Sequence, residues 1–91
     1  MTKQELVRRV ASDAELSQRD ANVMLDSLIE IIMETVASGE KVQLVGFGSF
    51  EAKQRAARIG RNPQTKEPVD IPAATVPTFH PGTIFKERVG R

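Results

Sequence analysis

Up to Gly39 the apolar residues recur every three to four positions, and beyond it they alternate, so the chain is expected to begin with helices and continue with strands. The first helix is expected to begin after Thr2, because Thr2 and Glu5 have the spacing of a capping box. A second helix is expected from Ser17 to just before Gly39, a residue type at which helices often end. The two helices form a predicted hairpin joined by residues 12–16.

The second predicted helix has an unusually broad apolar side, which spans about 160° at 100° per residue. A neighbouring helix and a sheet would cover only part of this arc, so its breadth favours a dimer seam, with Leu28 and Ile32 as the predicted dimer-core residues. The opposite stripe carries Asp26, Glu30 and Glu34. Because these carboxylates would repel phosphates, this stripe is expected to face away from any nucleic acid.

The second part of the chain reads as a short antiparallel sheet with helices packed on one face. Residues 41–45 alternate as a strand does, residues 46–50 form a tight turn with two glycines, and a second strand follows. A returning strand is expected from Val69 to about Val76, where Pro77 and then Pro81 are expected to end it. Residues 83–89 suit a short final helix. The fold class is α+β: a helical hairpin, a three-stranded antiparallel sheet with an extended β-ribbon arm, and a short C-terminal helix.

The length, cysteine content and charge of the chain limit the kinds of protein that it can be. Ninety-one residues allow one small domain, marginal by itself, and a hydrophobic content of 40% suggests a core completed by a second chain. There is no cysteine, which excludes a disulfide framework and a thiolate metal site. The net charge of +1 conceals a division, since residues 1–50 carry −3 and residues 51–91 carry +4. That asymmetry favours a polyanionic partner for the second half.

The segment from Lys53 to Lys66 concentrates this charge. It holds five basic residues, no acidic residue and one large apolar side chain, Ile59. Such a segment cannot bury itself, and a ribbon of two strands would project roughly 20–30 Å, far enough to enter a DNA groove. Three arginines, at positions 55, 58 and 61, can each meet phosphates or groove edges. Pro63 has a rigid ring without an N–H and suits a wedge between base pairs, but Asn62-Pro63 is also a common hairpin turn, and the residue types leave both roles open.

Three blocks of sequence resemble one known family. Residues 45–50 (VGFGSF), 60–65 (GRNPQT) and 71–73 (IPA) are similar to those of the bacterial histone-like HU and integration host factor proteins. The resemblance covers essentially the whole chain. It implies an intertwined dimer whose two β-arms lie in the minor groove of double-stranded DNA and kink it by inserting the proline at each tip.

The resemblance also implies roles for individual residues. Pro63 would be the intercalating wedge, with Arg61 and Asn62 beside it at the tip. Other basic residues would line the arm, namely Lys53, Arg55, Arg58 and Lys66. Lys3 and Lys86 would contact flanking phosphates, and the aromatic dimer core would contain Phe47, Phe50 and Phe79. The chain departs from the family at Thr83, where lysine is frequent, and at His80-Pro81, which puts one flanking phosphate contact in each subunit in question.

These observations predict one domain over residues 1–91, with a helical dimerisation part at 1–39, a sheet at 40–91, a DNA-binding arm at about 53–70 and a helix at about 83–89. The predicted function is that of a homodimeric, histone-like architectural protein of the cytoplasmic nucleoid, which binds DNA largely without sequence specificity, bends and compacts it, and prefers bent, nicked or kinked forms. One alternative is a subunit like integration host factor that prefers certain sequences and pairs with a different chain.

A second alternative is a dimerisation module whose basic arm binds an acidic protein. An enzyme is the least favoured class, because the single histidine, His80, is expected in a loop and no catalytic triad, metal-ligand cluster or phosphate-binding glycine loop is recognisable. No cofactor, metal or small-molecule substrate is expected. No membrane partner is expected either, since no apolar run approaches the length of a membrane span.

Overall fold

The computed structural model describes residues 1–90 and divides the chain into two compact units, Met1–Glu34 and Thr35–Arg91. The elements along the chain are α1 (Lys3–Asp13), α2 (Gln18–Ala37), β1 (Val42–Leu44), β2 (Gly48–Arg55), β3 (Arg58–Arg61), β4 (Pro68–Ile71), β5 (Ala74–Pro81) and α3 (Thr83–Val89). No helix in this range is both long and apolar enough to cross a membrane.

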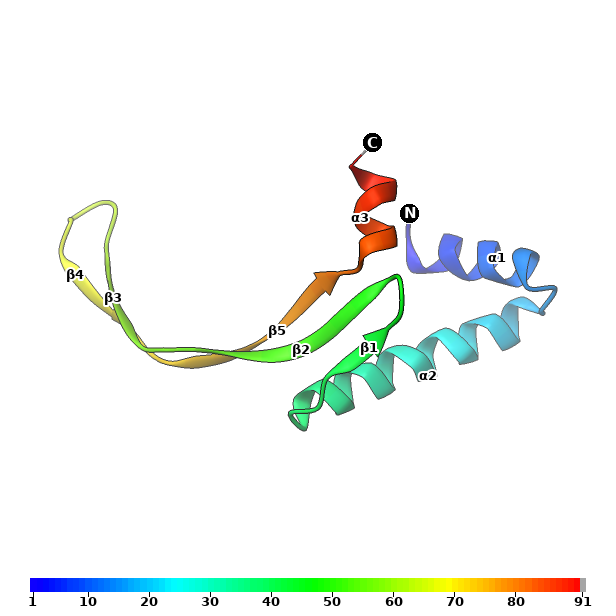
Figure 1. Cartoon of the computed structure of the whole chain (residues 1–91), viewed down its shortest axis with the longest axis horizontal. Helices are drawn as coiled ribbons and strands as arrows, with labels where there is room; N and C mark the ends of the chain where they lie inside the picture. Colours follow the sequence, from blue (N-terminus) through cyan, green and yellow to red (C-terminus); the bar gives the residue numbers. More distant parts are fainter. Residues whose placement is uncertain (91) are drawn as a thin grey trace. The chain divides into compact units, whose positions relative to one another are not determined.

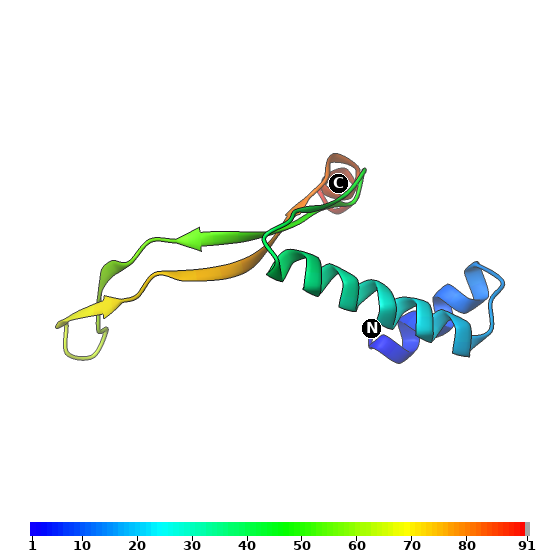
Figure 2. The ribbon, with the colours of Figure 1, turned by 90° about the horizontal axis from the view of Figure 1, so that it is seen from below.

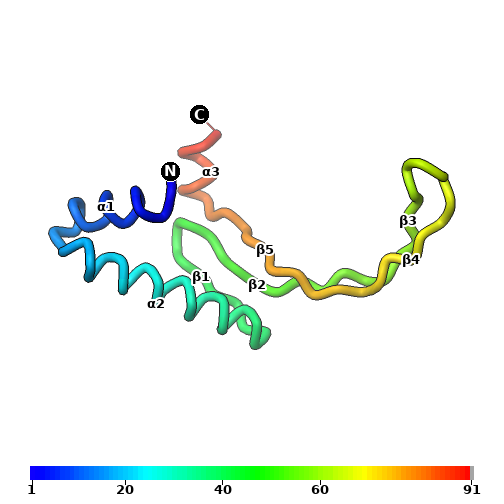
Figure 3. The backbone as a smooth tube through the Cα atoms, turned by 180° about the vertical axis from the view of Figure 1, so that it is seen from behind, coloured from blue at the N-terminus to red at the C-terminus, as the bar shows by residue number. Residues whose placement is uncertain are grey.

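The first unit is a hairpin of α1 and most of α2, as the sequence predicted (Figure 3). Both helix starts are capped: the hydroxyl of Thr2 accepts a hydrogen bond from the N–H of Glu5 at 3.3 Å, and that of Ser17 accepts one from Asp20 at 3.0 Å. At the end of α1, Glu15 takes a left-handed conformation with φ 57°, and the N–H of Leu16 reaches back to the carbonyl of Ala11.

The core of this unit is small. Val7, Ala11 and Ala21 are buried, and Leu25 packs against them. Farther along α2 the apolar side chains are largely exposed, with Met24 at 59%, Leu28 at 51% and Ile31 at 56%. An open, almost entirely apolar hollow of about 620 Å³ lies among these residues.

The end of α2 is set by Gly39. Its φ is +96°, its N–H donates to the carbonyl of Val36, and the N–H of Glu40 donates to the carbonyl of Thr35. This pair of bonds is the Schellman arrangement, which confirms the helix stop that the sequence predicted at this glycine.

The sheet has the strand order β1-β2-β5, and both pairings are antiparallel. Gly46, with φ of +84°, lies in the tight turn between β1 and β2, and Gly48, with φ of +153°, begins β2. The helix α3 packs on this turn: the N–H of Phe85 donates to the carbonyl of Gly46, and the N–H of Gly82 donates to that of Phe47.

The returning strand differs from the sequence expectation. Pro77 does not end the strand: β5 runs through Pro77 as far as Pro81 and is paired with β2 along this length. The physical reason is position in the sheet, since β5 is an edge strand and a proline nitrogen directed to the outer edge removes no ladder hydrogen bond. His80, expected in a loop, therefore lies within a strand opposite Ser49.

Beyond the three-stranded sheet, the chain continues as a two-stranded arm. The strands β2 and β5 run side by side into β3 and β4, which pair antiparallel as a second ladder and end in a loop (Figures 1 and 2). Three predicted features are thereby confirmed: the three-stranded antiparallel sheet, the ribbon arm and the terminal helix.

Candidate nucleic-acid interface

The first part of the candidate interface is one side of the β2–β5 ladder, called here the root face. Successive side chains of a strand point to opposite sides, so Glu51, Lys53 and Arg55 share this face. Lys53 and Arg55 are exposed and Glu51 is half-buried. The root face thus places two free cations in a row along the strand that leads into the arm.

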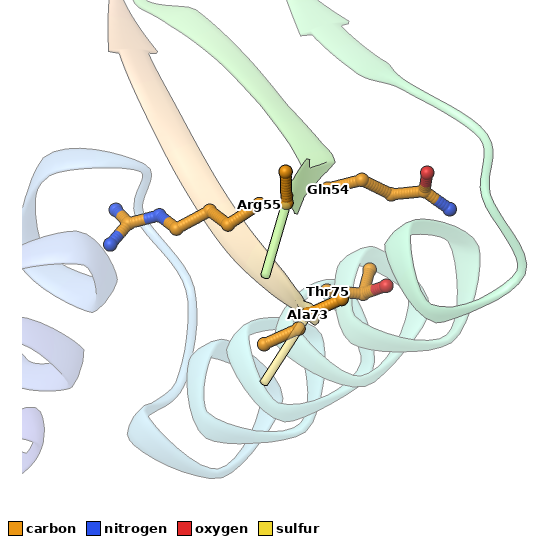
Figure 4. A pocket seen from close by; sticks show the side chains of 6 residues that line it. Gln54, Arg55, Ala73 and Thr75 are labelled. Carbon is orange, nitrogen blue, oxygen red and sulfur yellow. The ribbon is translucent and has the colours of Figure 1, made fainter. Parts of the chain in front are cut away.

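The two ladders of the arm are separated by a short break. Arg55 pairs with Ala74 and Arg58 pairs with Ile71, so the register is unchanged across the intervening residues. Pro72 lies in the break and has no N–H to donate, which explains why the ladder is interrupted there. An open hollow of about 440 Å³ lies at this point, and the side chains of Gln54 and Arg55 extend from it in opposite directions (Figure 4). The break is the natural place for the arm to bend.

The outer ladder distributes its cations over both sides of the ribbon. Arg58 lies opposite Ile71, whereas Arg61 belongs to the other side and lies opposite Pro68. Both arginines are exposed. A ribbon with a cation on each side can contact phosphates on both walls of a groove.

The tip is organised by Asn62. Its side-chain oxygen Oδ1 accepts a hydrogen bond from the N–H of Gln64 at 2.9 Å. Its carbonyl accepts one from Lys66 at 2.7 Å, and its own N–H donates to the carbonyl of Glu67 at 3.0 Å. Pro63 is exposed at the outer end of this loop. The hairpin-turn role of Asn62-Pro63 is therefore confirmed, and it is compatible with a wedge because the turn is what exposes the proline ring.

Two predicted contacts lie outside the arm. Lys86 is exposed on α3. Lys3 is half-exposed at the start of α1 and forms an ion pair with Asp26 of α2. Asp26 belongs to the acidic stripe of α2, which is expected to face away from nucleic acid, so this stripe holds one of the lysines predicted to contact phosphates.

The sequence did not reveal the side-chain contact between Glu51 and His80. The imidazole Nε2 of His80 lies 2.8 Å from Oε1 of Glu51. The signal was partly present, since the alternation of β2 placed Glu51 beside Lys53, but the expectation that β5 stops before Pro77 removed His80 from the sheet.

The predicted aromatic core residues come together in the second unit. The ring centroid of Phe79 lies 4.8 Å from that of Phe50 and 5.3 Å from that of Phe47. Phe85 of α3 joins them, stacked on Phe47 at 5.4 Å. Phe47 is nevertheless 46% exposed in the single chain, so part of this cluster is open to a further partner. Among residues 1–90, no group of three or more histidine, cysteine or acidic residues could hold a metal ion.

Comparison with known proteins agrees with this geometry. The sequence model of the family described as bacterial DNA-binding protein matches residues 1–90. The DNA-binding protein HU of Thermotoga maritima is 53% identical over 89 residues, which cover 98% of this chain and 99% of that protein. The DNA-binding protein HU of Clostridium pasteurianum is 52% identical over 91 residues, the full length of both.

Solved structures give the same result for the fold. The cocrystal structure of Anabaena HU with DNA has a TM-score of 0.89 and 50% identity, covering 98% of this chain and 97% of that one. HU from Thermotoga maritima has a TM-score of 0.70 and 39% identity, with 98% of each chain covered. With a family match over residues 1–90 and relatives identical at half of all positions, the chain belongs to the bacterial DNA-binding protein family that includes HU.

Proposed function

We propose that this protein is an HU-like architectural protein, a homodimer that binds double-stranded DNA largely without sequence specificity, bends it and helps to compact the bacterial nucleoid. The observation that carries the proposal is the arm: a two-stranded ribbon with exposed cations along its length and an exposed proline at its tip. The DNA-bound Anabaena HU, to which the chain is similar over 98% of its length, supports this partner.

The arm suits a groove because of where its charges lie. Arg58 and Arg61 occupy opposite sides of the ribbon, and the phosphates of a duplex flank its grooves on both sides. Lys53, Arg55 and Lys66 extend the row toward the root and around the tip. None of these contacts requires a particular base, so the affinity comes mainly from the release of counterions from phosphates.

Pro63 supplies the bend in this proposal. Its ring is apolar, has no N–H that would need a hydrogen-bond partner, and is held outward by the loop that Asn62 organises. Minor-groove architectural proteins, HU among them, unstack base steps with apolar wedges of this kind and kink the duplex. DNA that is already bent, nicked or kinked needs less deformation energy, which predicts a preference for such forms.

A second copy of the chain completes the core. The apolar side of α2, which includes Leu28 and Ile32, and the open edge of the aromatic cluster at Phe47 would both be covered by a partner. Burial of such surface provides about 25 cal/mol per Å², and a chain of this length buries too little by itself to be securely stable. The same contacts would present two arms to one duplex.

The runner-up is a subunit like integration host factor, which reads a defined site and pairs with a different chain. The relatives at 53% and 52% identity are HU proteins, and this favours the HU-like function. A purified single chain that sediments as a stable dimer and binds unrelated sequences equally would support HU-like function. A chain that binds one site strongly, and only with a second subunit, would support the alternative.

The test of the proposal is a gel-shift series on linear, nicked and cruciform duplexes at several salt concentrations. The logarithm of the affinity is expected to fall linearly with the logarithm of salt, with a slope of about −4 to −8 if roughly five to nine phosphates are neutralised. Tighter binding to nicked and cruciform DNA is expected at every salt concentration. A slope near zero, or equal displacement by an acidic protein and by DNA, would contradict DNA binding by the arm.

A further inference from the structure

His80 and Glu51 lie on the same face as the cations of the arm's root. His80 pairs with Ser49 in the ladder, and the pleat places Ser49 on the same side as Glu51 and Lys53. The contact of 2.8 Å between the imidazole Nε2 and the carboxylate of Glu51 confirms that these two side chains meet on the root face. The one acidic residue of β2 therefore lies among the groups proposed to bind DNA, and its partner is the chain's single histidine.

We propose that His80 is a further DNA-binding determinant: its protonation neutralises Glu51 on the root face and so strengthens DNA binding as the pH falls. This inference rests on the proposed placement of the root face against DNA. Histidine is the side chain that ordinarily changes charge between about pH 5 and pH 8, so the effect falls within a range in which DNA phosphates keep their charge.

The charged neighbours of the pair are few. From β2 they are Glu51 itself and, one step farther along the face, Lys53. Strand β1 has none within Val42–Leu44, but its register with β2, continued by one residue, places Lys41 opposite Glu51, and Lys41 forms no ion pair with Glu51 in the described part of the chain. From α3 the charged residues are Lys86, Glu87 and Arg88, and none of these forms an ion pair with Glu51 or His80 in the described part of the chain. Glu51 is therefore the carboxylate that the charge of His80 offsets.

The direction of the effect follows from the sum of charges. With neutral His80, the root face carries Glu51, Lys53 and Arg55, a net charge of +1 for each arm. Protonation raises this to +2 and leaves the carboxylate paired with a cation, which weakens its repulsion of a nearby phosphate. Each further phosphate that the protein neutralises adds about 0.9 to the salt slope, and at roughly 0.1 M salt this corresponds to up to about eightfold in affinity. A dimer has two such faces.

The experiment compares the salt dependence of DNA affinity at about pH 5.5 and about pH 8 for the wild type and for His80→Gln and His80→Lys. For the wild type, the slope is expected to be steeper by up to about 2 at the lower pH, with several-fold tighter binding. His80→Gln is expected to lose the difference between the two pH values, and His80→Lys to bind tightly at both. Thermal melts at each pH check that every variant remains folded.

Two outcomes overturn the inference: a wild type whose affinity does not change with pH, or a His80→Gln variant that keeps the whole change. Glu51→Gln provides a matched control, because it removes the repelling charge directly and should tighten binding at both pH values. Lys53→Gln tests the placement of the root face separately. If the salt slope of DNA affinity for Lys53→Gln equals that of the wild type at both pH values, the proposed placement of the root face fails. If the salt slope of Lys53→Gln falls but the DNA affinity of His80→Gln still changes fully with pH, only the inference about His80 fails.

Discussion

The side chain of Asn62 spans Pro63 and accepts a hydrogen bond from the backbone N–H of Gln64 at 2.9 Å. This bond fixes the backbone on both sides of the proposed wedge. Asn62→Ala removes the acceptor, a loss of about 1 kcal/mol of local stability, and is expected to abolish protection of the Gln64 amide from hydrogen exchange and to reduce DNA bending.

Asn62→Asp is the matched control, because a carboxylate oxygen can accept the same bond. It is expected to keep the Gln64 amide protected while the added negative charge reduces the salt slope by about 1 for each arm. Full protection of the Gln64 amide in Asn62→Ala would show that the loop does not depend on this side chain.

Pro63→Ala tests the wedge itself. The exposed ring makes no contribution to phosphate binding, so the variant is expected to retain most of the affinity, within about 1 kcal/mol, but to bend DNA markedly less. Fluorescence resonance energy transfer between the ends of a labelled duplex measures the bend, and a gel shift under the same conditions measures the affinity. Wild-type bending by Pro63→Ala would exclude intercalation by the proline.

Gly48 is packed too closely for any side chain. A Cβ atom there would lie 2.5 Å from the carbonyl oxygen of His80 and 2.6 Å from the ring of Phe79, and the φ of +153° is itself rare for other residues. Gly48→Ala is expected to lower the free energy of unfolding by at least about 2 kcal/mol, measured by urea denaturation.

Comparison with Gly39→Ala separates the cost of backbone strain at Gly48 from the cost of steric crowding there. Gly39 also has a positive φ, of +96°, but a Cβ there would have no neighbour within 4 Å. Its alanine variant should therefore lose only the conformational term, about 1 kcal/mol. Equal losses in the two variants would show that crowding at Gly48 is relieved by movement of β5.

Lys3→Gln tests the flanking phosphate contact that the family resemblance implies. Its ion pair with Asp26 is about half exposed, with side-chain exposures of 53% and 51%, so its loss should change stability by less than about 1 kcal/mol. If each Lys3 of a dimer binds a phosphate, the salt slope is expected to fall by about 2 in magnitude. A slope equal to that of the wild type would leave Lys3 as a structural residue of the helical hairpin.

Local signals in the sequence were enough to predict the helices. The hydroxyl of Thr2 and the glycine at position 39 influence only residues close to them in sequence, and the structure shows the helix start at the first and the helix end at the second that were expected. The arm followed from composition, because a segment with five cations and a single large apolar residue has nothing with which to form a core.

The parts that could not be predicted depend on distant residues. Whether Pro77 ends a strand depends on whether that strand lies at the edge of its sheet, and the sequence around Pro77 does not contain this information. The pairing of Glu51 with His80 depends in turn on the register of β2 and β5, two strands separated by the whole arm. The turn at Asn62-Pro63 was predicted, but its hydrogen bonds were not, because an asparagine can form several hydrogen-bonding patterns in a turn.

The dimer proposal makes the last prediction. Leu28 is 51% exposed on the apolar side of α2, and a charge placed there would be buried without a partner in the proposed dimer. Leu28→Asp is therefore expected to destabilise the dimer by at least about 3 kcal/mol, to make the melting temperature depend strongly on protein concentration, and to weaken DNA binding because one chain presents a single arm. Glu30→Gln, on the acidic stripe of the same helix, is the control and should leave the dimer intact. Sedimentation equilibrium measures the association directly, and a Leu28→Asp dimer as tight as the wild type would mean that this side of α2 is not the seam.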